Sequence, residues 1–159
     1  MSALPVAFDL YDWLLFLHVV AAMVWVGGVV ALNVLATQVL RSGEPDAVTR
    51  FTAGLRVIGP LALAPAVAAL LAFGIWMVAD SDAWNFGQTW VLVGLGLFAA
   101  AFVVGAAFQS RAAIGAQRAA AAGDAGEASR QLARWTWGMR LILVLLLVAT
   151  WDMVFKPGL

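Results

Sequence analysis

The sequence contains no cysteine, and its 159 residues include one histidine and one tyrosine. Without cysteine the chain can form no disulfide, zinc–thiolate site or iron–sulfur cluster and has no cysteine nucleophile. Charge is also scarce, because 11% of the residues are charged, against about a quarter in an average soluble domain. Nine basic residues balance nine acidic ones, so no net field attracts a polyanion, and we expect no nucleic-acid partner. Phosphate-binding loops, nucleotide fingerprints and serine-triad patterns are missing as well.

Apolar residues dominate what remains, at 64% of the chain with a mean hydropathy of +0.96. A soluble domain of this size buries only about two-thirds of its surface and could not hide them, so the sequence predicts an integral protein of the lipid bilayer. A spanning helix needs about 20 mostly apolar residues and satisfies its own backbone hydrogen bonds in lipid. The stretches that qualify are residues 10–40, 57–79, 90–108 and 132–156. We therefore expect an all-α fold, a four-helix transmembrane bundle that forms one domain over residues 1–159.

Helical segments are also predicted outside the bilayer. Residues 42–45 end the first span, and Val48, Phe51 and Leu55 then recur at helical spacing, which favours a short interfacial helix. A glycine-containing break at residues 123–126 interrupts an alanine-rich helical segment. The third helix should therefore project beyond the bilayer, and the fourth should begin outside it, as short cytoplasmic helical extensions.

Orientation follows from the basic residues. Eight of the nine lie in the first and third loops: Arg41, Arg50, Arg56, Arg111, Arg118, Arg130, Arg134 and Arg140. The positive-inside rule places these loops in the cytoplasm and both termini outside, an N-out/C-out topology. The first span is preceded by no basic residue, so it does not resemble a cleavable signal peptide. In a bacterium this means the inner (plasma) membrane with periplasmic termini.

His18 is the most informative polar residue, because polar groups at membrane depth are costly. It lies roughly 12 Å below the outer membrane edge, at about 1.5 Å per helical residue. Tyr11, His18 and Trp25 are spaced by seven residues and share one helical stripe. Gly28, close after Trp25, lets a neighbouring helix or a flat cofactor approach the backbone. The sequence leaves open whether His18 bonds a neighbouring helix, binds a ligand or handles protons.

Further candidates lie near the outer ends of other spans. Asp152 and Lys156 are four residues apart, so they can pair along one helix face, or contact a propionate, a quinone headgroup or a proton path. Lys156 could equally snorkel to the interface with Asp152 as its counter-ion. Met77 and Met153 carry soft thioethers that suit haem iron or Cu(I) beside His18, but methionine also fills cores.

The segment LHVVAAMVWVGGVV carries a family resemblance through His18, Trp25, Gly27 and Gly28. It resembles the Leu-His…Trp-x-Gly-Gly signature of the copper-resistance D (CopD)-like membrane superfamily and the first conserved helix of HemJ-type protoporphyrinogen oxidases. The ending MVFKPGL is similar to the Lys-Pro that closes HemJ-type chains. Length and four-span layout most resemble a small bacterial family of predicted integral membrane proteins, of uncharacterised function, within that relationship. The resemblance implies haem b or copper in the outer half of the bundle, with His18 matching the histidine implicated in haem binding and Lys156 an important lysine.

Three functions follow as expectations. The leading one is a haem b or porphyrin-like cofactor with a redox or porphyrin-handling role, as in a haem-dependent membrane oxidoreductase that exchanges electrons with quinone. Its cofactor-binding residues would be His18, Tyr11, Trp25, Gly28, Asp152 and Lys156. The second is copper handling, with His18, Met77 and Met153 as metal ligands. The third is a non-catalytic accessory subunit that packs on a membrane partner subunit or, as a homo-oligomer, on itself.

Overall fold

The structure is a computed structural model that describes residues 9–158, apart from the side chain of Pro45. Every regular element in this range is helical. In chain order the elements are α1 (Leu10–Ser42), α2 (Pro45–Ile58), η1 (Gly59–Leu63), α3 (Ala64–Asp80), α4 (Thr89–Val103), η2 (Val104–Gln109), α5 (Ser110–Ala121) and α6 (Ala125–Phe155). Residues 1–8, which the expected outer N-terminus includes, lie outside the described range.

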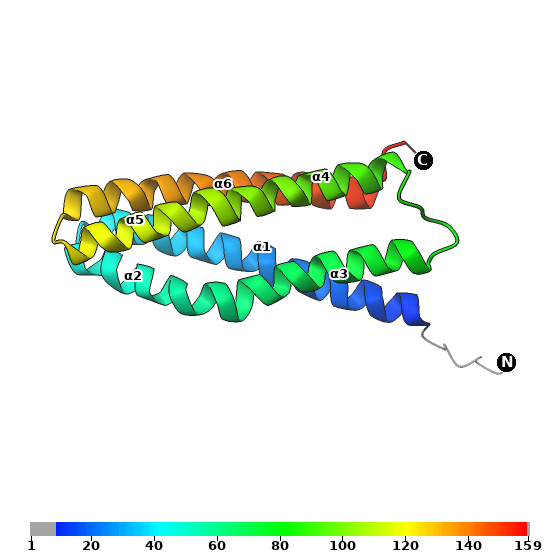
Figure 1. The fold of residues 1–159 in the computed structure, drawn as a ribbon, viewed down its shortest axis with the longest axis horizontal. Coiled ribbons are helices and arrows are strands. Elements are labelled where there is room, and N and C mark those ends of the chain that lie inside the picture. Colours follow the sequence, from blue (N-terminus) through cyan, green and yellow to red (C-terminus); the bar gives the residue numbers. More distant parts are fainter. Residues whose placement is uncertain (1–8, 159) are drawn as a thin grey trace.

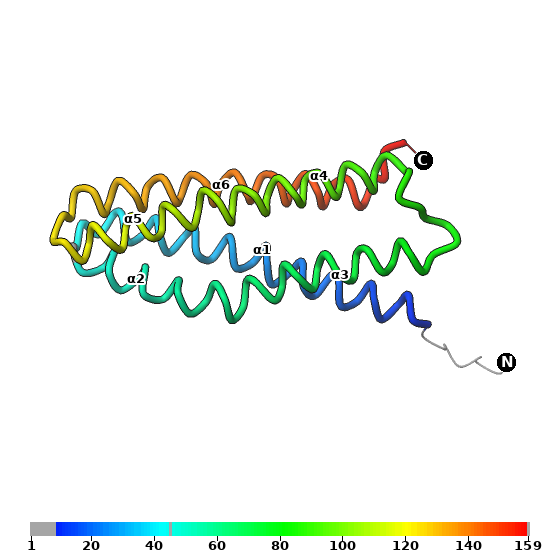
Figure 2. The backbone as a smooth tube through the Cα atoms, viewed as in Figure 1, coloured from blue at the N-terminus to red at the C-terminus, as the bar shows by residue number. Residues whose placement is uncertain are grey.

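Within residues 9–158, four continuous helices are long and apolar enough to cross a membrane: Leu10–Ser42, Asp46–Asp80, Thr89–Ala121 and Ala125–Phe155. The predicted all-helical bundle with four spans is therefore confirmed. Two starting points differ from the expected spans. The second helix begins before residue 57, because the π-helical turn η1 carries α2 into α3 without a break, as the tube in Figure 2 shows. The fourth helix begins at Ala125, ahead of the span expected from residue 132, because its start is capped there.

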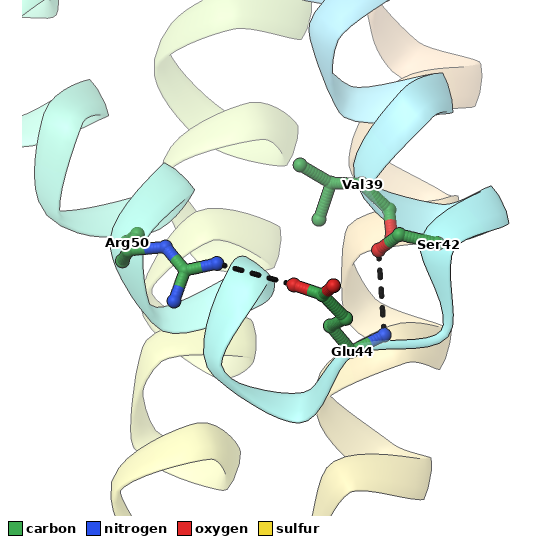
Figure 3. A network of polar contacts seen from close by, with 4 residues as sticks. All are labelled: Val39, Ser42, Glu44 and Arg50. Atoms are coloured by element: carbon green, nitrogen blue, oxygen red, sulfur yellow. Dashed lines mark hydrogen bonds and ion pairs between the residues drawn. The ribbon is translucent and has the colours of Figure 1, made fainter.

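Local hydrogen bonds explain where the helices begin and end. Asp9 and Asp12 form a capping box, in which the Asp12 backbone N–H donates to the Asp9 carboxylate at 2.9 Å. Gly43 ends α1 with a φ of 67°, a left-handed conformation that favours glycine. At the turn into α2, Glu44 accepts from Arg50 at 3.3 Å, and its backbone N–H donates to the Ser42 hydroxyl at 3.3 Å (Figure 3). These contacts stop α1 and turn the chain back.

The helices pack in two groups that meet at one end of the bundle. α1 packs against α3 and α6, while α6 also packs against α4 and α5, and α2 packs against α5. The enclosed core lies mainly where α1, α2, α5 and α6 meet, and includes Val29, Leu32, Ala36, Ala116 and Leu132. At the other end the α1–α3 pair diverges from the α4–α6 pair, and the 81–88 connection joins them (Figure 1). Over the described residues, α3 and α4 do not pack against each other.

The outward surface of the bundle is apolar. Met23, Leu61, Phe102 and Val154, one from each of the four long helices, are more than half exposed. A soluble fold would bury such side chains, whereas a bilayer solvates them. The surface therefore agrees with a membrane-embedded bundle.

Candidate ligand-binding cavity

A cavity of about 760 Å³ lies between the two diverging helix pairs, at the end of the bundle that carries the 81–88 connection. Its walls come from α1, α3, α4, α6 and that connection, and most of them are aliphatic or aromatic. Lys156 is the one charged side chain among its lining residues, and Tyr11, His18 and Thr150 are polar. A smaller hollow of about 330 Å³ at the opposite end is lined by Leu35, Arg50 and their neighbours.

Six of the residues singled out in the sequence line this cavity together: Tyr11, His18, Trp25, Met77, Met153 and Lys156. They come from α1, α3 and α6 and the turn after α6. The stripe on α1 therefore faces the interior. Trp25 is buried against Phe98 of α4, with the ring centroids 5.6 Å apart, and also belongs to the core, so it marks the inner end of the cavity.

His18 is half-buried and joins α1 to α3 through one hydrogen bond. Its Nδ1 lies 2.9 Å from the backbone carbonyl oxygen of Leu70. A carbonyl oxygen can only accept, so Nδ1 carries a proton, and in the neutral ring Nε2 then keeps its lone pair. Histidines that bind metals usually donate their second nitrogen in this way, which raises the basicity of the ligating one. The arrangement both ties two helices together and leaves Nε2 available.

Aromatic rings hold Lys156 at the other polar position of the cavity. Its ammonium nitrogen lies 4.2 Å from the centroid of Trp84 and 5.5 Å from that of Trp90, and the two indoles meet edge to face. The Trp84 ring N–H donates to the hydroxyl of Tyr11 at 3.3 Å, which ties the 81–88 connection to α1. Lys156 adopts a left-handed φ of 43° at the end of α6, and its backbone N–H donates to the Asp152 carbonyl oxygen at 2.8 Å.

Asp152 does not form the ion pair with Lys156 that their spacing allows. Its side chain is fully buried, and neither carboxylate oxygen has a hydrogen-bond partner among the described residues. The carboxylate packs against Gly94 of α4, whereas the left-handed turn directs Lys156 to the indoles. Spacing by four residues permits a pair, but the neighbouring helix and connection decide where each side chain goes.

The sequence profile of a family described as predicted integral membrane protein (DUF2269) matches residues 12–157. The chain belongs to this family. The match covers the cavity from His18 to Lys156. No curated protein and no solved structure matches the chain.

Two other candidate residues of this DUF2269 protein lie away from the lining. Gly28 faces the side chain of Leu63, so it serves the contact between α1 and η1. Asp152 sits behind the cavity wall, between α6 and α4. Asn33 bonds across helices as its polarity in a spanning segment suggests, donating to the Thr136 carbonyl oxygen of α6 at 3.4 Å.

Two polar residues were not singled out by their spacing. Gln109 is buried at the end of η2 against Gly138, and its amide nitrogen and oxygen have no partner in the described part of the chain. Thr150 lines the cavity, and its hydroxyl donates to the Leu146 carbonyl oxygen at 2.9 Å. The one feature of the sequence that could have identified Gln109 and Thr150 is that each is a polar residue within an apolar run. The side of the helix that each would face was not visible in the sequence.

Metal chemistry here would depend on His18 and thioethers. Within residues 9–158 no group of three or more histidine, cysteine or acidic side chains comes together. Met77 of α3 and Met153 of α6 line the same cavity as His18 of α1. The cavity thus offers one imidazole nitrogen and two sulfur atoms from three helices.

Proposed function

We propose that this DUF2269 protein binds haem b, or a closely related porphyrin, in the cavity and has a redox or porphyrin-handling role. The observation that carries the proposal is the His18 ring, which donates from Nδ1 to the Leu70 carbonyl oxygen and leaves Nε2 as a ligand. The volume of about 760 Å³ is within the range of about 300–1,000 Å³ usual for small-molecule sites.

The remaining lining suits a flat, amphiphilic macrocycle. Trp25 and Phe98 provide aromatic surface at the inner end, and aliphatic side chains line the walls. Lys156 supplies the single positive charge, which would neutralise a propionate. With one histidine in the chain, His18 would hold the iron, and the thioether of Met77 or Met153 would be the further ligand that the lining offers. When bound, haem supplies one-electron redox chemistry.

Quinone is the electron partner that we propose for this role. Ile75, Leu147 and Val154 line the cavity and keep 42–68% of their surface exposed, so the cavity is open along an apolar edge. A lipid-soluble carrier can therefore reach the cavity from within the bilayer, between helices that do not pack together there.

The charge distribution supports a bacterial inner-membrane location with the cavity on the periplasmic side. Seven of the eight arginines lie in the half of the bundle opposite the cavity, toward the α1–α2 and α5–α6 turns, and Arg140 lies at the middle of α6. The positive-inside rule assigns that end to the cytoplasm. The start of α1 and the end of α6, next to the lining residues Tyr11 and Lys156, lie at the cavity end (Figure 1).

The test is an absorption spectrum of detergent-purified, haem-replete protein, oxidised and dithionite-reduced, with a tag that contains no histidine. We expect a Soret band that shifts on reduction and is lost in His18→Ala. Asn33→Ala is the matched control, because it removes another polar side chain of α1, one bonded to α6 and absent from the cavity lining. A featureless wild-type spectrum after haem titration, or a Soret band unaffected by His18→Ala, would overturn the proposal.

Copper handling is the second candidate, because His18, Met77 and Met153 line one cavity. Thioether sulfur and imidazole nitrogen suit Cu(I). Titration with Cu(I) against a chromogenic chelator should then show tight binding in the wild type and loss in Met77→Leu/Met153→Leu. Binding that is indifferent to both substitutions would exclude this site.

A further inference from the structure

The ring of His18 rests against Gly74 of α3, a residue that the cofactor proposal does not use. A Cβ atom built at Gly74 would lie 3.0 Å from Cε1 of His18 and 3.3 Å from Nδ1. Carbon atoms in contact normally stay about 3.5–4.0 Å apart. The imidazole therefore occupies space that any other residue at this position would fill with its side chain.

Gly74 also lies one helical turn after Leu70, whose carbonyl oxygen accepts from His18. In an α-helix the carbonyl of a residue points toward the N–H four residues later, and each Cβ is tilted back toward the N-terminus. A side chain at position 74 would consequently stand beside the Leu70 carbonyl. Its absence opens a lateral approach to an oxygen that a helix normally screens.

We propose that Gly74 is a positioning residue that exposes the Leu70 carbonyl to His18 Nδ1 and so presents Nε2, unprotonated, to the cavity. The ligand role of Nε2 rests on the proposed function, whereas the tautomer does not. Two features of α3 thus act together on one ring: the carbonyl at position 70 accepts the proton, and the glycine at position 74 leaves room for the ring to reach it.

Gly74→Ala adds a methyl group that is fixed to the backbone of α3 and lies too close to the His18 ring. The ring should therefore move away from it by a few tenths of an ångström. The 2.9 Å hydrogen bond then lengthens, and the preference of Nδ1 for the proton weakens. Removing such a bond behind a metal ligand typically lowers metal affinity by about 10–100-fold. Because Gly74→Ala weakens the bond and does not remove it, we expect a loss in haem affinity at the lower end of this range, about tenfold.

The tautomer can be measured without a cofactor. The chain has one histidine, so ¹⁵N-histidine labelling of protein with a histidine-free tag gives one pair of ring signals. In cofactor-free wild type, at a pH where the ring is neutral, Nδ1 should be the protonated nitrogen and Nε2 the unprotonated one. In Gly74→Ala we expect the Nε2-protonated form, or a mixture of the two. A wild type protonated at Nε2 would overturn the inference before any variant is made.

Two glycines of α1 serve as controls for the same substitution. Gly27→Ala meets nothing within 4 Å, so it should leave both tautomer and haem affinity unchanged. In Gly28→Ala the new Cβ atom would lie 2.6 Å from Cδ2 of Leu63. This variant therefore disturbs helix packing to a similar degree but does not contact His18. If Gly28→Ala changed the tautomer as much as Gly74→Ala does, the effect would be general loosening of the bundle, and the inference would fail.

The two proposals fail in different ways. If wild type binds no haem but shows protonated Nδ1 that is lost in Gly74→Ala, the haem function is wrong and the role of Gly74 stands. If wild type binds haem through His18 while Gly74→Ala keeps both the tautomer and the affinity, the haem function stands and the role of Gly74 is wrong.

Discussion

Lys156 offers a direct test of how the end of the cavity is held together. The ammonium contacts the faces of Trp84 and Trp90, and the nearby Asp152 carboxylate is turned away toward α4. Lys156→Met removes the charge while keeping much of the apolar stem, and Trp84→Leu removes the nearer indole. A double-mutant cycle of these two changes isolates their interaction from the other contacts that each residue makes.

The expected coupling free energy between Lys156 and Trp84 follows from the distance of the ammonium nitrogen to the rings and from the burial of Lys156. A cation–π contact is worth about 0.5–1 kcal/mol when exposed and about 2 kcal/mol when desolvated. Lys156 is half-buried, its nitrogen is 4.2 Å from the Trp84 centroid, and the second ring at 5.5 Å is close to the limit of such contacts. We expect a coupling free energy of about 1 kcal/mol, which is about fivefold in the unfolding equilibrium constant.

The assay is reversible unfolding in mixed micelles titrated with SDS, followed by tryptophan fluorescence. The chain has eight tryptophans, so Trp84→Leu leaves seven to report. A parallel cycle pairs Lys156→Met with Asp152→Asn and should give a smaller coupling than the Trp84 cycle, because the two side chains form no ion pair. A larger coupling to Asp152 than to Trp84 would show that the ion pair forms and that the placement of Lys156 over the indoles is wrong.

Three other predictions can be checked with the same preparations. Asp152→Asn keeps the side-chain volume and removes a buried acid that has no partner in the described part of the chain, so the unfolding free energy should stay the same or rise, by at most about 3 kcal/mol; a clear fall would reveal a partner for the carboxylate. Leu132→Ala opens the core where α6 meets α5 and should lower the unfolding free energy by about 2–5 kcal/mol, whereas a loss below about 1 kcal/mol would contradict its full burial. Because the chain has no cysteine, Ala83→Cys and Ala122→Cys can be labelled individually in intact bacteria; an impermeant maleimide should reach position 83 alone, and labelling at 122 would reverse the proposed topology.

Much of the architecture is determined locally and was therefore predictable from the sequence. Each spanning helix depends on the apolar character of about 20 consecutive residues, which holds wherever the helix packs. The shared face of Tyr11, His18 and Trp25 follows from helical periodicity alone, and all three line one cavity. Helix-capping residues also act within one turn of the chain, as Gly43 does at the end of α1 and Asp124 at the start of α6.

Boundaries were less predictable where helices fuse. Arg50 and Arg56 make the 45–58 segment amphipathic, which favours a separate interfacial helix. Its continuation through η1 depends on a π-helical turn that accommodates the residues around Pro60. A sequence pattern records which residues are apolar but not whether two helical segments share one axis.

The sequence by itself determined that this protein is a four-span helical membrane protein with a histidine and a tryptophan on one stripe of its first helix. Only the tertiary structure decided what those side chains meet. His18 finds its acceptor 52 residues away at Leu70, and Lys156 contacts the indole of Trp84, while the Asp152 carboxylate has no partner within residues 9–158. The physical reason is that apolar periodicity specifies which face of a helix is buried, whereas hydrogen bonds and cation–π contacts need partners whose positions depend on how separate helices pack.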